Sequence, residues 1–182
     1  MIIGITGSFG AGKGVVVDYL SKTRGFKHYS ASGFIKEEIV RRGLPVDRDS
    51  MILIGNAIRA EYGPAYIIET LYKRAEEAGG DAVIEALRAV AEAKKIKELG
   101  GLVIGVDADS KLRYERAFAR KSEKDNVPYD KWLEQERIEN NATDPTRQNI
   151  SGALKESDVI VTNNGTPEEL FAQVEEALQK IK

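Results

Sequence analysis

The first residues of the chain constrain it more than any other segment. A short apolar run, Ile2 to Thr6, has the composition of a buried strand, and residues 13–22 have helical character. Between them lies a glycine-rich stretch that ends in lysine, with the sequence Gly7-Ser8-Phe9-Gly10-Ala11-Gly12-Lys13. This order of strand, loop and helix is the context in which a G-x-x-x-x-G-K pattern wraps a phosphate group.

The pattern predicts phosphate binding for physical reasons. Glycine permits the backbone conformations that turn successive amide groups inward. The N-terminal end of the following helix adds partial positive charge, and Lys13 adds a mobile full charge for the outer phosphates. We therefore expect the loop to bind ATP through the following residues: Ser8, Phe9, Gly10, Ala11, Gly12, Lys13, Gly14 and Val15.

Gly14 stands where the general pattern has serine or threonine. The hydroxyl that ordinarily holds Mg²⁺ is missing there, and Val15 does not supply one. Either the loop is degenerate, or a carboxylate holds the metal through water. We expect the second arrangement, with no direct protein ligand and with Glu85 as the candidate carboxylate.

The amino-acid composition limits which kinds of reactive site and partner are possible. The chain has no cysteine, which excludes disulfides, thiolate metal sites and cysteine nucleophiles. Its single histidine, His28, is interpreted as structural or surface-exposed. With a formal net charge of −2, no strong field attracts nucleic acids or acidic membranes. We expect a cytoplasmic monomer or homodimer that acts on small-molecule nucleotides, without nucleic-acid or membrane partners.

Apolar runs alternate with amphipathic segments along the chain. Strands are expected at residues 2–6, 27–29, 81–85, 102–106 and 158–161. Helices are expected at residues 13–22, 32–42, 47–61, 65–78, 90–99, 110–121 and 129–141, and from residue 166 nearly to the C-terminus. This alternation predicts an α/β fold, in which helices cover both faces of a parallel sheet.

Three segments resemble the nucleoside monophosphate kinases. The loop ends in Gly-Lys-Gly, as in adenylate kinases. The segment Tyr29-Ser30-Ala31-Ser32-Gly33-Phe34-Ile35-Lys36 is similar to the one that opens their acceptor-binding region. Ile84-Glu85-Ala86-Leu87-Arg88 looks like their third strand, whose end carries an acid and a phosphate-gripping arginine. The resemblance implies acceptor contacts from the following residues: Ser30 or Ser32, Lys36 and Arg88.

The second half of the chain is similar to dephospho-coenzyme A kinase. Val106-Asp107-Ala108-Asp109, followed by Arg116 and Arg120, matches its pattern of strand, acid, helix and arginines. Residues 158–166 resemble its last strand and the loop that cups the adenine. The resemblance implies Arg116 near the adenine and Arg120 on the phosphates. It assigns the adenine loop to Asn163, Asn164 and Gly165.

The two resemblances together imply a P-loop NTPase three-layer fold. Its five-stranded parallel sheet would have the order 2-3-1-4-5. We expect a single domain whose core comprises residues 1–30, 81–120 and 150–182. Residues 31–80 would form a helical acceptor-binding insertion, and residues 121–149 a small lid.

Phosphoryl transfer depends on positioned cations, because the transferred group carries dispersed negative charge. Arg116 and Arg120 are four residues apart and share a helix face. Arg59 and Tyr62 flank Gly63-Pro64 and suit a phosphorylated acceptor and its base; tyrosines that merely pack a helical subdomain are the alternative. The expected catalytic residues are Lys13, Glu85, Arg88, Arg120 and Arg137.

The pattern as a whole favours an ATP-dependent phosphotransferase. The acceptor would be a nucleoside or deoxynucleoside monophosphate, and dephospho-coenzyme A is the alternative. A third possibility is an ATP-binding regulatory protein with little turnover, since residues 14 and 15 carry no hydroxyl. A GTPase switch is disfavoured, because the sequence has no guanine-reading Asn-Lys-x-Asp motif.

Overall fold

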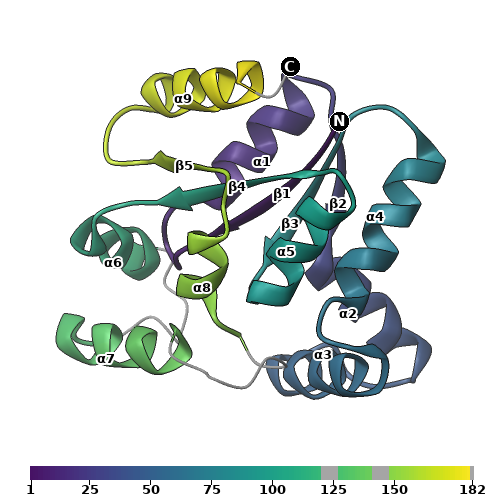
Figure 1. Ribbon diagram of the computed structural model, residues 1–182. Helices are drawn as coiled ribbons and strands as arrows, with labels where there is room; N and C mark the ends of the chain where they lie inside the picture. Colours follow the sequence, from purple (N-terminus) through teal and green to yellow (C-terminus); the bar gives the residue numbers. More distant parts are fainter. Residues whose placement is uncertain (120–126, 141–147, 181–182) are drawn as a thin grey trace.

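A five-stranded parallel sheet forms the centre of the molecule (Figure 1). The computed structural model describes residues 1–119, 127–140 and 148–180. The strand order is β2-β3-β1-β4-β5, as expected. The strands are β1 (Ile2–Gly7), β2 (Lys27–Ser30), β3 (Ala82–Leu87), β4 (Leu102–Asp107) and β5 (Val159–Thr162).

The described helices follow the expected alternation, with one addition. They are α1 (Lys13–Lys22), α2 (Ala31–Arg41), α3 (Arg48–Tyr62), α4 (Tyr66–Ala78), α5 (Val90–Glu98), α6 (Ser110–Ala119), α7 (Tyr129–Asn140), α8 (Ile150–Lys155) and α9 (Pro167–Gln179). The addition is α8, whose six residues are too few to show a helical period in the sequence. None of the described helices combines the length and apolarity that crossing a membrane requires.

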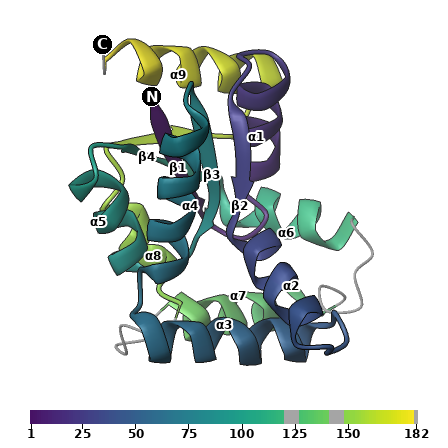
Figure 2. The ribbon, with the colours of Figure 1, turned by 90° about the vertical axis from the view of Figure 1, so that its right-hand side faces the viewer.

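Each face of the sheet has its own hydrophobic core. Side chains alternate between faces along a strand, so Ile3 and Ile5 of β1 point to one side and Ile2 to the other. The first side packs against α1 and α9. The second packs against α2, α3, α4, α5 and α8. Figure 2 shows α9 at the top of the view and α3 with α7 at the bottom, beyond the carboxyl ends of the strands.

Helix starts agree with local sequence signals. Thr166 caps α9 by accepting a hydrogen bond from the Glu169 amide at 3.3 Å, and the Glu169 carboxylate accepts from the Thr166 amide at 3.0 Å. Asp47 caps α3 through the Ser50 amide at 2.8 Å. These caps satisfy amides that the first helical turn leaves unpaired.

Candidate active site

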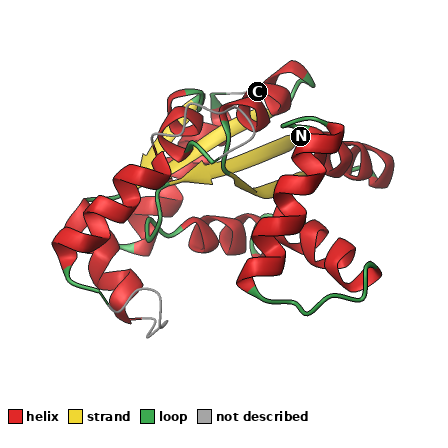
Figure 3. Ribbon diagram, turned by 90° about the horizontal axis from the view of Figure 1, so that it is seen from below, coloured by secondary structure: helices red, strands yellow, loops and turns green. Residues whose placement is uncertain are grey.

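The carboxyl ends of the parallel strands meet at one edge of the sheet, and most predicted site residues lie there. The phosphate loop follows β1, Glu85 lies near the end of β3, Asp107 ends β4 and Asn163 follows β5. The helices around this edge are seen from below in Figure 3. Open α/β sheets bind ligands at this edge, so the arrangement suits a site.

The glycines of the phosphate loop are required by both conformation and space. Gly10 and Gly12 have φ values of +77° and +94°. A Cβ at Gly10 would lie 2.4 Å from the Arg113 carbonyl oxygen, and one at Gly12 would lie 2.2 Å from Asn163 Nδ2. No side chain is tolerated at either position without movement of the neighbouring elements.

The loop presents a concentration of hydrogen-bond donors. The Lys13 ammonium lies across the loop and donates to the carbonyl oxygens of Gly7 at 2.7 Å and Ser8 at 2.9 Å. Four loop amides donate to no other described residue: those of Phe9, Gly10, Gly12 and Gly14. Open amides beside a lysine at a helix N-terminus suit an anion.

Gly14 differs from the other loop glycines. A Cβ there would have no atom within 4 Å, apart from its chain neighbours and its own helix backbone. Val15 is likewise exposed. Packing therefore does not require glycine at this position, and the missing hydroxyl is not a consequence of crowding.

The Asp107 carboxylate is a second acid at the site, which the sequence reading placed only in a strand–acid–helix pattern. Among the described residues, its Oδ1 is the one buried side-chain atom that lacks a hydrogen-bond partner. The Arg113 Nε lies 3.8 Å away. A buried carboxylate oxygen that accepts no hydrogen bond, next to a phosphate loop, fits the oxygen donors that Mg²⁺ prefers.

The loop after β5 braces the phosphate loop. Asn163 is buried, and its Nδ2 donates to the Ala11 carbonyl at 2.8 Å. Arg116 Nη1 donates to the Asn163 carbonyl at 2.9 Å, and the Asn164 Oδ1 accepts from the Asp109 amide at 2.8 Å. Both asparagine side chains are thus engaged within the protein, which leaves backbone groups to face a nucleotide.

Arg113 is a site residue that the sequence reading missed. It is 8% exposed and donates from Nε to the Ala108 carbonyl at 2.8 Å and from Nη1 to the Phe9 carbonyl at 3.2 Å. It also pairs with Glu136 of α7 and lies over the Trp132 ring, 5.3 Å from its centroid. No motif marks Arg113, because its partners come from the loop and α7.

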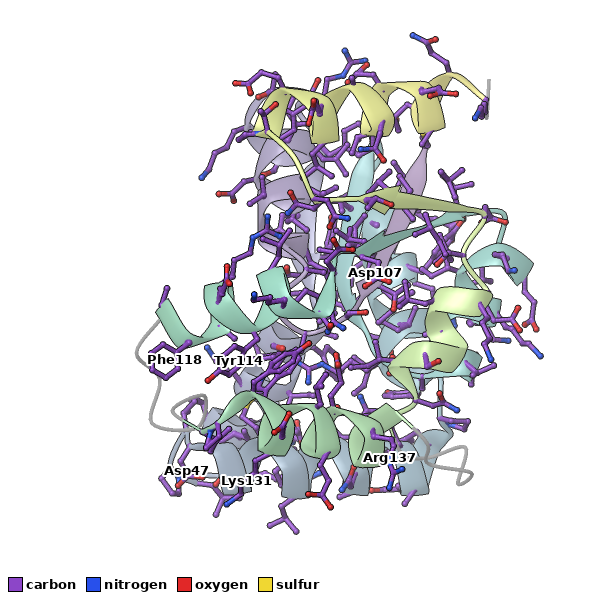
Figure 4. All side chains as sticks on the ribbon, turned by 90° about the vertical axis from the view of Figure 1, so that its left-hand side faces the viewer. Asp47, Asp107, Tyr114, Phe118, Lys131 and Arg137 are labelled. Atoms are coloured by element: carbon purple, nitrogen blue, oxygen red, sulfur yellow. The ribbon has the colours of Figure 1, made fainter. Side chains whose placement is uncertain are left out.

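An aromatic cluster joins α6 to α7. Tyr114 contacts Tyr129 and Trp132 with ring centroids 5.2 and 5.8 Å apart, and Phe9 lies 6.5 Å from Trp132. Figure 4 shows Tyr114 and Phe118 between these helices. Trp132 is buried within this cluster.

Glu85 lies beside the single histidine. His28 Nε2 is 3.2 Å from Glu85 Oε1, so the histidine has a partner that the sequence did not reveal. Parallel pairing of β2 with β3 brings them together. The next residue, Ala86, has a φ of +70°, and the register with β1 shifts there. Such a bulge re-aims the strand end, which carries Glu85 and Arg88.

The predicted acceptor residues lie at several places. Ser30 caps α2 by accepting from the Gly33 amide at 3.2 Å. Arg59 is buried and pairs with Glu92, whereas Tyr62 is 54% exposed and stacks on Tyr66 with a centroid separation of 4.6 Å. The remaining predicted residues of α2 are the half-buried Ser32 and the exposed Lys36.

The predicted arginines also differ in placement. Arg88 is exposed, and its Nη1 donates to Gln148 over 3.4 Å. Arg137 is exposed on α7, where Figure 4 shows it on the side away from α6. Arg120 lies outside the described residues. The catalytic and binding roles of these side chains stay predictions.

The sheet order and the phosphate loop define a P-loop NTPase with a kinase-like fold. A sequence profile described as "AAA domain", AAA_18, matches residues 3–144. A UPF0200 protein of Aeropyrum pernix is 30% identical over 172 residues, which cover 93% of this chain and 88% of that protein. The chain therefore belongs to the AAA_18 domain family and to the UPF0200 family.

Solved structures agree with this fold. The structure of TT1252 from Thermus thermophilus has a TM-score of 0.64 at 20% identity and covers 100% of this chain and 98% of its own. Shikimate kinase from Aquifex aeolicus has a TM-score of 0.57 at 19% identity, with coverages of 99% and 97%. At these identities the likeness concerns the fold alone.

Proposed function

We propose that this protein is an ATP-dependent phosphotransferase that passes the γ-phosphate of ATP to a nucleoside or deoxynucleoside monophosphate. The proposal rests mainly on one observation, the phosphate loop. Its open amides and the Lys13 ammonium form a preorganised group of donors. Such donors stabilise the charge of a phosphoryl group in flight without reorganising during the reaction.

The donor nucleotide lies between the phosphate loop and the loop after β5. The Asn163–Ala11 hydrogen bond keeps these two loops at a fixed separation. Arg116, held on the Asn163 carbonyl, borders the same region and contributes a guanidinium close to the base. Backbone groups of residues 163–165 read the adenine, because the two asparagine side chains are already engaged.

The acceptor lies beyond the end of β3, between α2 and α3. Arg88 binds the acceptor phosphate, since a guanidinium fork fits phosphate oxygens bidentately. Tyr62 offers an exposed ring for a base to stack on. The attacking oxygen of a monophosphate is already ionised near neutral pH, so Glu85 acts on the magnesium ion and not as a base, and His28 orients its carboxylate.

Two carboxylates fit a magnesium ion bound together with ATP. Glu85 would hold it through water, and Asp107 Oδ1, which accepts no hydrogen bond, is a further candidate. A magnesium ion would neutralise charge on the outer phosphates. The hydroxyl that usually serves this purpose is absent, so these acids replace it.

A coupled ADP-release assay tests the proposal. The acceptor panel contains the ribo- and deoxyribonucleoside monophosphates and dephospho-coenzyme A. It also contains shikimate, because several of the similar solved structures are shikimate kinases. We expect acceptor-dependent ADP release with a monophosphate. ATP binding without acceptor-dependent ADP from any compound would instead support a regulatory ATP-binding protein.

Replacement of Lys13 tests the loop itself. Lys13→Ala removes the cation from the outer phosphates and should lower turnover by about 100-fold or more. Lys22→Ala is the matched control, because Lys22 is an exposed lysine at the other end of α1 that pairs with Asp18. Full activity in Lys13→Ala would contradict the assignment of the loop.

A further inference from the structure

Glu92 is a fully buried carboxylate outside the predicted site. It lies in the first turn of α5, and its exposed fraction is 0%. Its Oε2 accepts from the backbone amides of Arg88 at 2.6 Å and Ala89 at 3.1 Å. The carboxylate therefore satisfies the N-terminus of α5 and fixes the backbone of the residue proposed to bind the acceptor phosphate.

The other oxygen of the same carboxylate holds a second arginine. Glu92 Oε1 accepts from Arg59 Nε at 3.3 Å and from Arg59 Nη2 at 3.2 Å. Arg59 comes from α3 and is 7% exposed. Its Nη1 donates to no other described residue. The edge of the guanidinium that carries Nε and Nη2 is thus fixed by Glu92, and Nη1 remains available to bind an anion.

Stability alone is a weak reason for such a pair. Removing two charges from water is costly, and well-packed apolar residues of similar size are often as stabilising as a buried ion pair. A buried pair does offer a fixed geometry, since both groups are held by directional hydrogen bonds. At Glu92 this geometry links α3, α5 and the turn after β3.

We propose that Glu92 is a positioning residue that holds Arg59 and Arg88 together as a two-arginine cradle for the anionic group of the acceptor. This inference rests on the proposed phosphotransferase function. Glu92 itself does not touch the acceptor. It fixes the Arg88 backbone through one oxygen and the Arg59 guanidinium through the other, so that the remaining N–H groups of both arginines serve one anion.

The strained turn before Arg88 is a further observation in favour of the two-arginine cradle. Ala86 adopts a left-handed conformation that residues with a Cβ rarely take, and the Thr6 hydroxyl donates to the Leu87 carbonyl at 3.0 Å. Thr6 is fully buried. Strain of this kind persists where surrounding contacts overdetermine the backbone, and it gathers at ligand sites.

Binding of AMP to protein saturated with a non-hydrolysable ATP analogue tests the inference. The analogue fills the donor site, so AMP reports on the acceptor site. Glu92→Gln keeps the volume but loses the charge that fixes Arg59. We expect the Kd for AMP to rise about tenfold or more, since the loss of one hydrogen bond to a charged group weakens binding by about that factor. The Kd for the ATP analogue should change less than twofold.

The surface pair of Glu37 and Arg74 provides the matched control. Its closest nitrogen–oxygen distance is 3.2 Å, the same as in the Arg59–Glu92 pair, but both of its side chains are exposed. Glu37→Gln should leave both dissociation constants unchanged. An unchanged Kd for AMP in a folded Glu92→Gln variant would overturn the inference, as would wild-type protein that binds no AMP.

Two further variants separate positioning from folding. Arg59→Lys keeps a positive charge but removes the fork, and it should weaken AMP binding about tenfold even where Glu92→Gln fails to fold. In the double variant Arg59→Lys/Glu92→Gln, the loss in AMP affinity should be smaller than the product of the losses in the two single variants. Full AMP affinity in Arg59→Lys, or independent effects in the double variant, would contradict the cradle.

Binding and turnover also distinguish the two proposals. Wild-type protein that binds AMP through Glu92 but releases no ADP with any acceptor would refute the phosphotransferase and leave the cradle intact. Turnover of a monophosphate with no effect of Glu92→Gln on AMP binding would refute the cradle and leave the phosphotransferase intact.

Discussion

At the scale of single residues, space decides what the phosphate loop accepts. Gly12 has no room for a methyl group beside Asn163, whereas Gly14 faces open space. Both glycines are adjacent to Lys13, but the fold requires glycine only at position 12. At position 14 the fold would also accept a residue with a side chain.

Paired substitutions test this difference. Gly12→Ala forces a side chain into a left-handed conformation and against Asn163, so the free energy of unfolding should fall by at least about 1–2 kcal/mol. Gly14→Ala lies in α1 without such strain and should be neutral or stabilising by up to about 1 kcal/mol. Urea denaturation measures both. Equal effects of the two substitutions would contradict the loop geometry.

At the scale of elements, α2 contains a charge cluster that responds to pH. Hydrogen bonds from Arg41 and then from Arg42 lower the pKa of Glu38 from 4.5 to about 2. The ionised carboxylate is therefore favoured in the folded protein. Its contribution to stability is present above pH 4.5 and is lost as the pH falls through about 2.

Thermal unfolding across this range tests the cluster. The Tm of Glu38→Gln should lie below that of the wild-type protein above pH 4.5, and the difference should disappear as the pH approaches 2. Glu77→Gln, an exposed change on α4, is the control and should show no such difference. A Tm difference that does not depend on pH would show that the charge is not responsible.

At the scale of the whole molecule, the phosphate loop is a junction. Asn163 joins it to the last strand, and Arg113 joins it to α6 and α7. A nucleotide bound there acts on elements from both ends of the chain. We therefore expect nucleotide binding to stabilise the described core as one cooperative unit.

Equilibrium unfolding with a non-hydrolysable ATP analogue measures this coupling. At 100 times its Kd, the analogue should raise the free energy of unfolding by about 2.7 kcal/mol. Fluorescence of Trp132, the single tryptophan, reports on α7, and far-UV circular dichroism reports on all the helices. The two signals should change together, and separate transitions would show that α7 is not coupled to the loop.

Local patterns in the sequence predict the alternation of strands and helices, the phosphate loop and most helix boundaries, whereas the strand order was expected from the family resemblance. Glycine spacing, apolar runs and the Thr166 cap all act over a few residues. Only the folded structure reveals the contacts of Glu92, Arg113 and His28. Each meets partners far away in the chain, and a buried charge carries no local signature until the fold supplies its partner.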